Sequence, residues 1–320
     1  MEQQSYLIHG LNLTLAGEPQ LLKDLRARLG RFQAGIPGVP PDIHFEFIPS
    51  SHTTGPCVKR PPGPGRVILG PDFGEVLYFE TTDQLYLADP DGIRAVSDLR
   101  QGRVLIEHGP LDRQTRWLLS HLFFTVFLME LLKRRGLYMV HAAGLALGGR
   151  GLLIAGASGA GKTTLALTLL RAGFGFLGDD TIILDADAKA LAFPDEIDIT
   201  PQTARFFPEL ESLTHDPAPG EPPKHSFCAD QVYAAPTCWQ CVPMALIFPT
   251  HTPAPASLLS PMPADQALLH LACNVLRTEQ KTSQAHLTAL AALVTQCRCY
   301  RLATGRDFDR LPDLLRTIIE

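Results

Sequence analysis

The sequence Gly156-Ala157-Ser158-Gly159-Ala160-Gly161-Lys162-Thr163 matches the pattern G-x-x-x-x-G-K-[ST] of a phosphate-binding loop. The apolar run before it, residues 151–155, predicts a short buried strand that leads into the loop. The run after it, residues 163–171, predicts a helix that ends at Gly173. The motif requires this strand, loop and helix order, so the context favours a phosphate site over a glycine-rich turn that binds nothing.

The residue types in this loop suit a nucleoside triphosphate with Mg²⁺. The glycines let backbone N–H groups face phosphate oxygens, and the start of the helix adds a favourable dipole. Lys162 is the expected contact to the β- and γ-phosphates, and the hydroxyl of Thr163 is the expected Mg²⁺ ligand. The full set of residues that we expect to bind the nucleotide is Gly156, Ser158, Gly159, Ala160, Gly161, Lys162, Thr163 and Thr164.

An acidic pair follows the predicted helix. The strand-like segment 174–178 ends in Asp179-Asp180, so we expect the pair on a neighbouring strand beside the loop. Two adjacent carboxylates there can divide the work, because one can orient Mg²⁺ while the other accepts a proton from a substrate hydroxyl. The alternative is a polar turn that only caps the following segment.

Taken together, His141, the loop that starts at Gly156 and the pair Asp179-Asp180 resemble the core of the bacterial HPr kinase/phosphorylase family. The segment 140–147, VHAAGLAL, is similar to the histidine-containing strand of that family. The resemblance covers residues 141 to about 185. It implies an α/β fold with a P-loop kinase core of the HPr kinase and phosphoenolpyruvate carboxykinase type.

The resemblance also implies an activity and a set of roles. The activity is Mg²⁺-dependent transfer of the γ-phosphate of ATP to a serine hydroxyl of a protein. By position, Asp179 would be the general base, and Asp180 would hold Mg²⁺ together with Thr163. His141 would sit close to the phosphates, which makes Asp179, His141 and Lys162 the expected catalytic residues.

Two departures from the family narrow the expected substrate. Ala157 stands where the family loop usually has an acidic residue, and the glycine- and arginine-rich C-terminal signature used for the reverse reaction is missing. The chain looks more like divergent HPr kinase-like proteins of peptide natural-product clusters, some of which phosphorylate a lasso-type precursor peptide. We therefore expect a serine kinase whose acceptor is a peptide or small protein. A kinase of a small hydroxylated metabolite such as free serine, and a nucleotide-binding regulatory module, remain alternatives.

The organisation of the chain indicates two domains. Residues 1–136 predict an accessory α+β module, for which we suggest substrate recognition, and residues 137–320 predict the kinase-like catalytic domain. In the first module we expect one strand at residues 6–15, a half-buried strand at 43–48 and an amphipathic helix at 20–32. A bridging helix at 112–135 contains an apolar stretch that is shorter than the roughly 20 residues of a membrane span and carries polar residues, so we interpret it as a core helix.

Composition excludes some classes of partner. With 45% hydrophobic and 19% charged residues, the chain is typical of a globular protein. A net charge of -5 argues against nucleic acid as a partner. No signal peptide is visible, and the odd count of seven cysteines suggests reduced thiols, so we expect a cytoplasmic location. The sequence leaves homo-oligomerisation open.

Several further residues are weaker candidates. Cys238, Cys241, Cys297 and Cys299 could supply zinc ligands, but the second pair has the wrong spacing for a zinc knuckle and buried thiols are the favoured interpretation. Four charged residues could contact metal, phosphate or nucleotide, although a solvated surface position is the alternative for each: Glu196, Lys224, Arg277 and Arg306.

Overall fold

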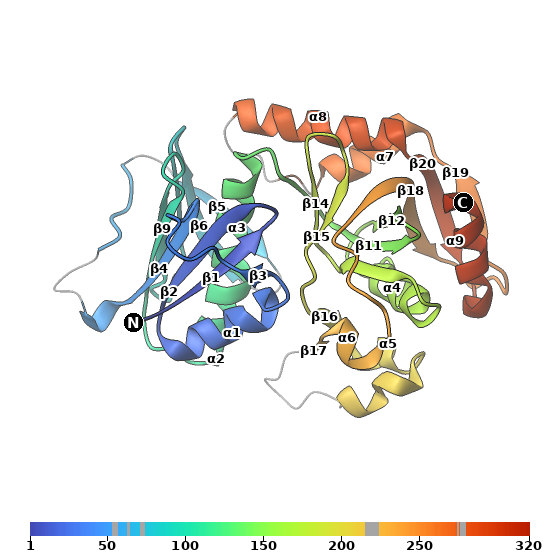
Figure 1. Cartoon of the computed structure of the whole chain (residues 1–320), viewed down its shortest axis with the longest axis horizontal. Coiled ribbons are helices and arrows are strands. Elements are labelled where there is room, and N and C mark those ends of the chain that lie inside the picture. Colours follow the sequence, from blue (N-terminus) through green and yellow to red (C-terminus); the bar gives the residue numbers. More distant parts are fainter. Residues whose placement is uncertain (53–56, 63–64, 71–73, 215–223, 274, 276–279) are drawn as a thin grey trace. The chain divides into compact units, whose positions relative to one another are not determined.

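The computed structural model of the chain describes residues 1–52, 57–62, 65–70, 74–214, 224–273, 275 and 280–320 (Figure 1). The backbone folds into two compact units. Unit 1 comprises Met1–Arg135 and Arg277–Thr282, and unit 2 comprises Gly136–Leu276 and Ser283–Glu320. Each unit contains a large mixed sheet with helices, so the protein belongs to the α/β class, as the sequence predicted.

Unit 1 is built on a nine-stranded sheet. Its strands, in spatial order, are β3 (Gln33–Ala34), β1 (Glu2–Ile8), β2 (Leu11–Gly17), β4 (Ile43–Pro49), β9 (Arg103–His108), β8 (Arg94–Asp98), β7 (Gln84–Ala88), β6 (Gly74–Glu80) and β5 (Arg66–Gly70). Strand β4 runs parallel to both β2 and β9. Its side chains alternate as predicted, with Ile43, Phe45 and Phe47 buried, because successive residues of a strand point to opposite faces.

The expectation of one strand over residues 6–15 is wrong. The chain reverses at His9 and Gly10, whose φ angles are 46° and 87°, and β1 pairs antiparallel with β2 from Ile8 opposite Leu11. Both turn residues therefore lie in the left-handed region, which is typical of the tight turns that match the twist of a hairpin. The usual signal for such a turn is Asn-Gly or Asp-Gly, and His-Gly is a weaker one.

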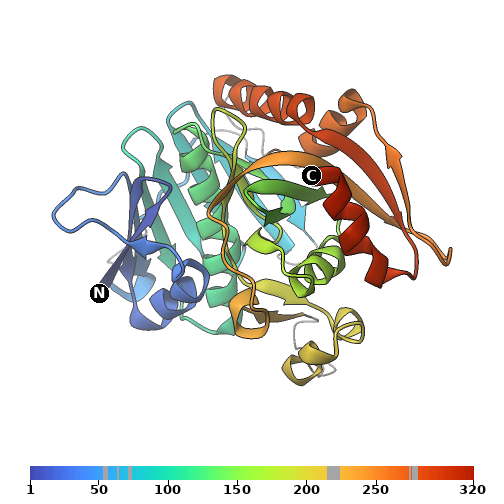
Figure 2. The ribbon, with the colours of Figure 1, turned by 45° about the vertical axis from the view of Figure 1, so that its right-hand side comes forward.

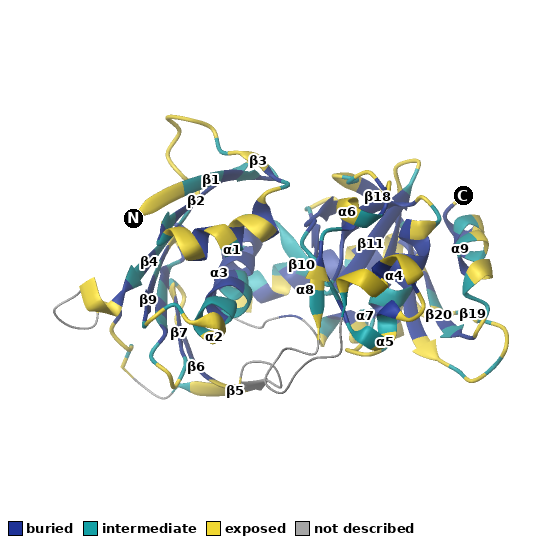
Figure 3. Ribbon diagram, turned by 90° about the horizontal axis from the view of Figure 1, so that it is seen from below, coloured by how far each residue is buried: buried dark blue, intermediate teal, exposed yellow. Residues whose placement is uncertain are grey.

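Two longer helical segments of the described chain lie in unit 1. Helix α1 (Pro19–Leu29) buries Leu21, Leu22, Leu25 and Leu29 completely, so the amphipathic helix is confirmed, and its opposite face is exposed in Figure 3. The second is continuous from α2 (Arg113–Trp117) through a π-helical stretch, η2 (Leu118–Phe123), to α3 (Phe124–Lys133).

This second helix contains the apolar stretch that the sequence predicts to be a core helix. Within the part of the chain that the structure describes, Arg113–Lys133 is the one helix that is long and apolar enough to cross a membrane. Of its most apolar 18-residue stretch, 61% is buried inside the protein. Phe124 packs on Phe45 of β4 with ring centroids 5.0 Å apart. The segment therefore serves as a core helix of unit 1.

Unit 2 is also organised around one large sheet. Its strands, in spatial order, are β10 (Tyr138–Val140), β14 (Ile182–Leu184), β15 (Ala190–Ala192), β18 (Gln240–His251), β12 (Arg150–Ala155), β11 (Ala142–Leu147) and β13 (Gly175–Gly178), with β20 (Arg298–Thr304) on β18 and β19 (Leu258–Pro261) on β20. Strands β12, β18 and β20 are parallel. Their carboxyl ends therefore meet at one edge, where open α/β sheets bind ligands.

Helices cover both faces of this sheet (Figures 1 and 2). On one face, α4 (Lys162–Arg171) and α9 (Leu311–Ile319) share a hydrophobic cluster with β12. On the other face, α7 (Ala264–Ala272) and α8 (Gln280–Gln296) pack in a second cluster. Strands β11, β12, β13, β14 and β15 are almost entirely buried, which explains why their sequences read as continuous apolar runs.

Two glycines position the segments that flank the site. Gly173 ends α4 with a φ of 85°, and the N–H groups of Gly173 and Phe174 donate to the carbonyls of Leu170 and Leu169, which is a Schellman ending. Gly178 ends β13, and a Cβ there would lie 2.5 Å from the carbonyl oxygen of Thr181 and 2.6 Å from that of Phe193. Only glycine fits at Gly178 without moving backbone.

We predict that Gly178→Ala destabilises unit 2 much more than Gly173→Ala does. The Cβ added by Gly173→Ala meets open space, so this substitution costs only about 1–2 kcal/mol for the left-handed backbone. The Cβ added by Gly178→Ala must displace two carbonyl groups. Trp239 lies in unit 2 and Trp117 in unit 1, so urea unfolding in a Trp117→Phe background follows unit 2 through Trp239 fluorescence. Equal losses in the two variants would contradict the close packing of Gly178.

Candidate functional site

The glycine loop motif, Gly156 to Thr163, follows the end of β12 at Ala155 and runs into the first turn of α4, which begins at Lys162. Gly159 and Gly161 have φ angles of 76° and 97°, which residues with a Cβ rarely adopt. A Cβ at Gly159 would meet nothing within 4 Å, so the loop is open on that side. The predicted strand, loop and helix are therefore observed, and the loop has room for a ligand at the N-terminus of α4.

Lys162 folds back over this loop. Its side chain is only 6% exposed, and its ammonium group donates to the carbonyl oxygens of Gly156 at 3.2 Å and Ala157 at 3.5 Å. The same nitrogen lies 3.7 Å from a carboxylate oxygen of Asp180. The cation is thus held at the loop, where it can neutralise phosphate charge.

The acidic pair forms a tight turn beside the loop. Asp179 is buried, and its Oδ2 accepts a hydrogen bond of 2.9 Å from the hydroxyl of Thr163. The N–H of Thr181 donates to the carbonyl of Asp179, and Asp180 takes a left-handed φ of 63°. Because of this turn, the two neighbouring carboxylates face different partners.

His141 lies between β10 and β11 and contacts Asp180 twice. Its Nδ1–H donates to the backbone carbonyl of Asp180 at 3.0 Å, and its Nε2 lies 3.9 Å from the carboxylate of the same residue. The Asp180 side chain is 48% exposed. The structure therefore brings His141 and Lys162 to Asp180, and Thr163 to Asp179.

The electrostatic environment of Asp179 is unusual. Burial, together with the neighbouring charge of Asp180, raises the pKa of its carboxyl to about 7, against the smaller opposing effects of Thr163 and Lys162. Its Oδ1 is buried and has no hydrogen-bond partner among the described residues. A buried polar atom of this kind is costly, and a proton, a substrate hydroxyl or a cation could satisfy it.

These residues fit a nucleoside triphosphate and Mg²⁺. The open glycine loop and Lys162 suit phosphate oxygens, while Thr163 and the two carboxylates offer the oxygen ligands that Mg²⁺ prefers. In the described part of the chain, no three His, Cys, Asp or Glu side chains form a metal cluster. Mg²⁺ needs no such cluster, since it is usually held by one or two carboxylates together with substrate phosphates.

The weaker candidates lie in varied positions. Glu196 is half-buried, and its N–H donates to the side chain of Asp195. Lys224 and Arg306 are exposed, and Arg277 lies outside the described residues. Their suggested roles remain predictions.

The four cysteines behave as buried or half-buried thiols. Cys241, Cys297 and Cys299 belong to a hydrophobic cluster of unit 2, and Cys238 packs against it. Burial raises the pKa of Cys241 and that of Cys297 to about 12, as is typical of thiols packed among apolar side chains. The structure supports buried thiols over a zinc site.

One contact of the glycine loop was not predicted from the sequence. His251, the last residue of β18, donates its Nε2–H to the carbonyl of Gly159 at 3.1 Å. The two residues are 92 positions apart, and the segment around His251 carries no motif. The available signal was its place at the carboxyl end of an apolar strand, an edge where ligand sites gather.

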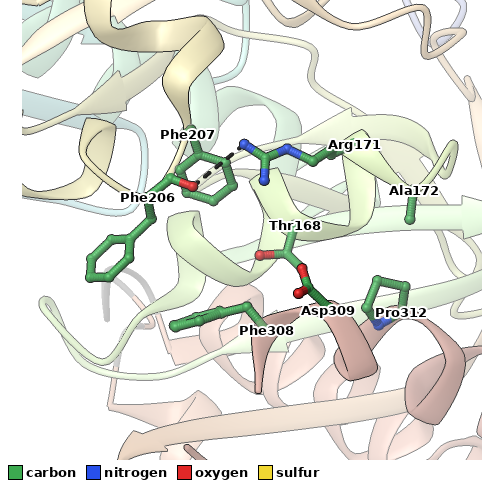
Figure 4. Close-up of a pocket in the computed structure, with 8 residues that line it drawn as sticks. All are labelled: Thr168, Arg171, Ala172, Phe206, Phe207, Phe308, Asp309 and Pro312. Atoms are coloured by element: carbon green, nitrogen blue, oxygen red, sulfur yellow. Dashed lines mark hydrogen bonds between the residues drawn. The ribbon is translucent and has the colours of Figure 1, made fainter. Parts of the chain in front are cut away.

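A cavity of about 290 Å³ lies elsewhere in unit 2, at the C-terminal end of α4 (Figure 4). Arg171 lines it and pairs with Glu209 at 2.6 Å, and Phe206 and Phe308 contact each other with ring centroids 5.5 Å apart. None of the residues expected to bind nucleotide lines this cavity. The groups capable of chemistry gather at the opposite end of the same helix.

We predict that Asp179→Asn makes the ligand-free protein less sensitive to pH. The folded pKa of about 7 lies above the unfolded value, so this group's contribution to stability is full below the unfolded pKa and is lost as pH rises through 7. Asn keeps an acceptor for Thr163 and carries no charge. The thermal midpoint should therefore fall less between pH 5 and pH 8 in the variant than in the unmodified protein. Each 1 kcal/mol of pH-dependent destabilisation that the substitution removes should reduce this fall by roughly 2–4 °C. The same fall in both proteins would contradict a buried, titrating Asp179.

Comparison with known proteins gives little beyond this geometry. No family model matches the chain, and no curated protein matches its sequence. Among solved structures, the HPr(Ser) kinase/phosphatase from Coxiella burnetii is similar over 57% of this chain and 93% of its own, with 18% identity and a TM-score of 0.28. That is a distant structural likeness only.

Proposed function

We propose that unit 2 is an ATP- and Mg²⁺-dependent phosphotransferase that acts on a serine hydroxyl of a peptide or small protein. The observation that carries the proposal is the link between Thr163 and Asp179. It joins the first turn of a helix after a glycine loop to a buried carboxylate with one unsatisfied oxygen. Phosphoryl transfer needs this combination of anion cradle, metal ligand and proton acceptor.

The glycine loop and Lys162 would bind and orient the phosphates. When bound, ATP with Mg²⁺ supplies the phosphoryl group and neutralises its charge. Backbone N–H groups at the start of α4 would donate to phosphate oxygens, as those at helix N-termini do. The ammonium of Lys162, already held at the loop by two carbonyls, would contact the phosphates and stabilise charge in the transition state.

Asp179 is suited to remove the proton of the acceptor hydroxyl. A pKa of about 7 leaves the carboxylate substantially ionised at neutral pH and able to take a proton. Its Oδ1 would accept that proton as the acceptor oxygen forms a bond to the γ-phosphorus. The bond from this phosphorus to the β,γ-bridging oxygen breaks, and its electron pair leaves with ADP.

Asp180 and Thr163 are the proposed metal ligands. The Thr163 hydroxyl gives its hydrogen to Asp179, so its oxygen lone pairs remain available to a cation. The Asp180 carboxylate is half exposed beside Lys162. In the structure the Thr163 hydroxyl bonds Asp179 and not Asp180. Which of the two acids is the general base and which is the metal ligand can be tested by substituting each one.

The openness of the site favours a macromolecular acceptor over a small metabolite. Gly159 faces empty space and the Asp180 side chain is half exposed, whereas kinases of small metabolites enclose their substrates. A groove of about 800 Å³ in unit 1, lined by charged side chains that include Glu46, Asp98 and Arg103, is the proposed place for recognition. A lasso-type precursor peptide is the finer candidate, and we propose a cytoplasmic location.

The test is transfer of label from [γ-³²P]ATP with Mg²⁺ to serine-bearing peptides and, in parallel, to free serine. We expect labelled phosphoserine in a peptide, and a loss of about 10²–10⁴-fold in kcat for Asp179→Asn. Asp187→Asn is the matched control, because Asp187 is an exposed acid outside the site. Labelling of free serine alone would favour the metabolite kinase, and binding of ATP without transfer would favour the regulatory module.

The roles of the two acids separate in the dependence on Mg²⁺. If Asp180 is the ligand, Asp180→Asn raises the Mg²⁺ concentration needed for half-maximal rate, while Asp179→Asn lowers kcat at saturating Mg²⁺. The reverse pattern would exchange the two assignments.

A further inference from the structure

Strand β18 extends beyond its neighbour toward the glycine loop. Parallel pairing sets Ile154 of β12 opposite Ile247 of β18, and β12 ends one residue later whereas β18 continues to His251. At about 3.3 Å per residue, the end of β18 therefore reaches past the point where the loop begins. Pairing of His251 with Thr304 of β20 fixes it in the sheet.

The imidazole of His251 contacts the loop in two ways. Its Nε2–H donates to the carbonyl of Gly159, and a Cβ on Gly161 would lie 3.0 Å from its Cε1. The ring thus lies against the last glycine before Lys162, while its N–H holds the peptide that follows Gly159. Both glycines have left-handed φ angles, 76° for Gly159 and 97° for Gly161.

We propose that His251 is a positioning residue that holds the glycine loop in its nucleotide-binding shape; this rests on the proposed function of the same site. Glycines lose more conformational freedom on ordering than any other residue. A loop that is already held in shape loses less conformational entropy when it binds a ligand, so the ligand binds more tightly. A residue fixed in a central strand is a more precise support than one on a flexible loop.

The two contacts can be separated by substitution. His251→Phe keeps a ring against Gly161 and removes the donor, whereas His251→Gln keeps an N–H near the position of Nε2. His270→Phe is the matched control, because His270 is an exposed histidine of the same unit whose ring packs on Phe248. The readouts are the Kd of Mg²⁺-mant-ATP, the thermal midpoint of the ligand-free protein, and the KM for ATP against kcat.

We expect His251→Phe to raise the Kd and the KM for ATP about three- to tenfold, as loss of one hydrogen bond does. Its kcat and thermal midpoint should stay close to those of the unmodified protein. His251→Gln should bind within about twofold of it. Unchanged binding in His251→Phe, or equal weakening in His251→Gln, overturns the proposal, and so does a fall in thermal midpoint that parallels the loss of affinity.

Failure of this inference is distinguishable from failure of the proposed function. If the unmodified protein binds mant-ATP and labels a peptide while His251→Phe behaves identically, only the role of His251 fails. If it binds mant-ATP without transferring phosphate and His251→Phe binds more weakly, the kinase proposal fails and the role of His251 stands. If the unmodified protein does not bind mant-ATP, both fail.

Discussion

The hydrogen bond from the Thr163 hydroxyl to the buried carboxylate of Asp179 connects the two parts of the candidate site. One part is the glycine loop at the end of β12, and the other is the acidic turn at the end of β13. Without this bond, a buried acid would have neither of its oxygens satisfied, which is costly. The bond therefore holds the turn against the first turn of α4.

Several features of this arrangement lower the stability of the folded protein but keep polar groups available to a ligand. Asp179 is buried with one orphan oxygen, and Asp180 adopts a left-handed φ that non-glycine residues seldom adopt. Gly178 allows the turn to approach the carbonyls of Thr181 and Phe193. Such costs cluster where a site must present charged groups to a ligand. His251, at the end of β18, also bonds the carbonyl of Gly159 in the glycine loop.

The sequence predicted the local parts of the site well, because each part is encoded by neighbouring residues. The buried strand before the loop and the helix that ends at Gly173 are both present, as are the four buried leucines of α1. The hairpin of β1 and β2 was missed since His9-Gly10 is a weak turn signal between apolar residues. His251 was missed because its contact with Gly159 depends on parallel pairing of strands distant in sequence. The partner of Thr163 was equally out of reach, since the left-handed turn at Asp180 decides which carboxylate faces the helix.

We propose that the glycine loop of unit 2 binds a nucleoside triphosphate through Lys162. Isothermal titration of the whole chain with ATP in the presence of Mg²⁺ tests it most directly, since it requires no acceptor. We expect one site per chain, and an affinity that falls at least about tenfold in Lys162→Ala, the loss expected for a hydrogen bond to a charged group. Absence of binding in the unmodified protein, or equal affinity in Lys162→Ala, would contradict it.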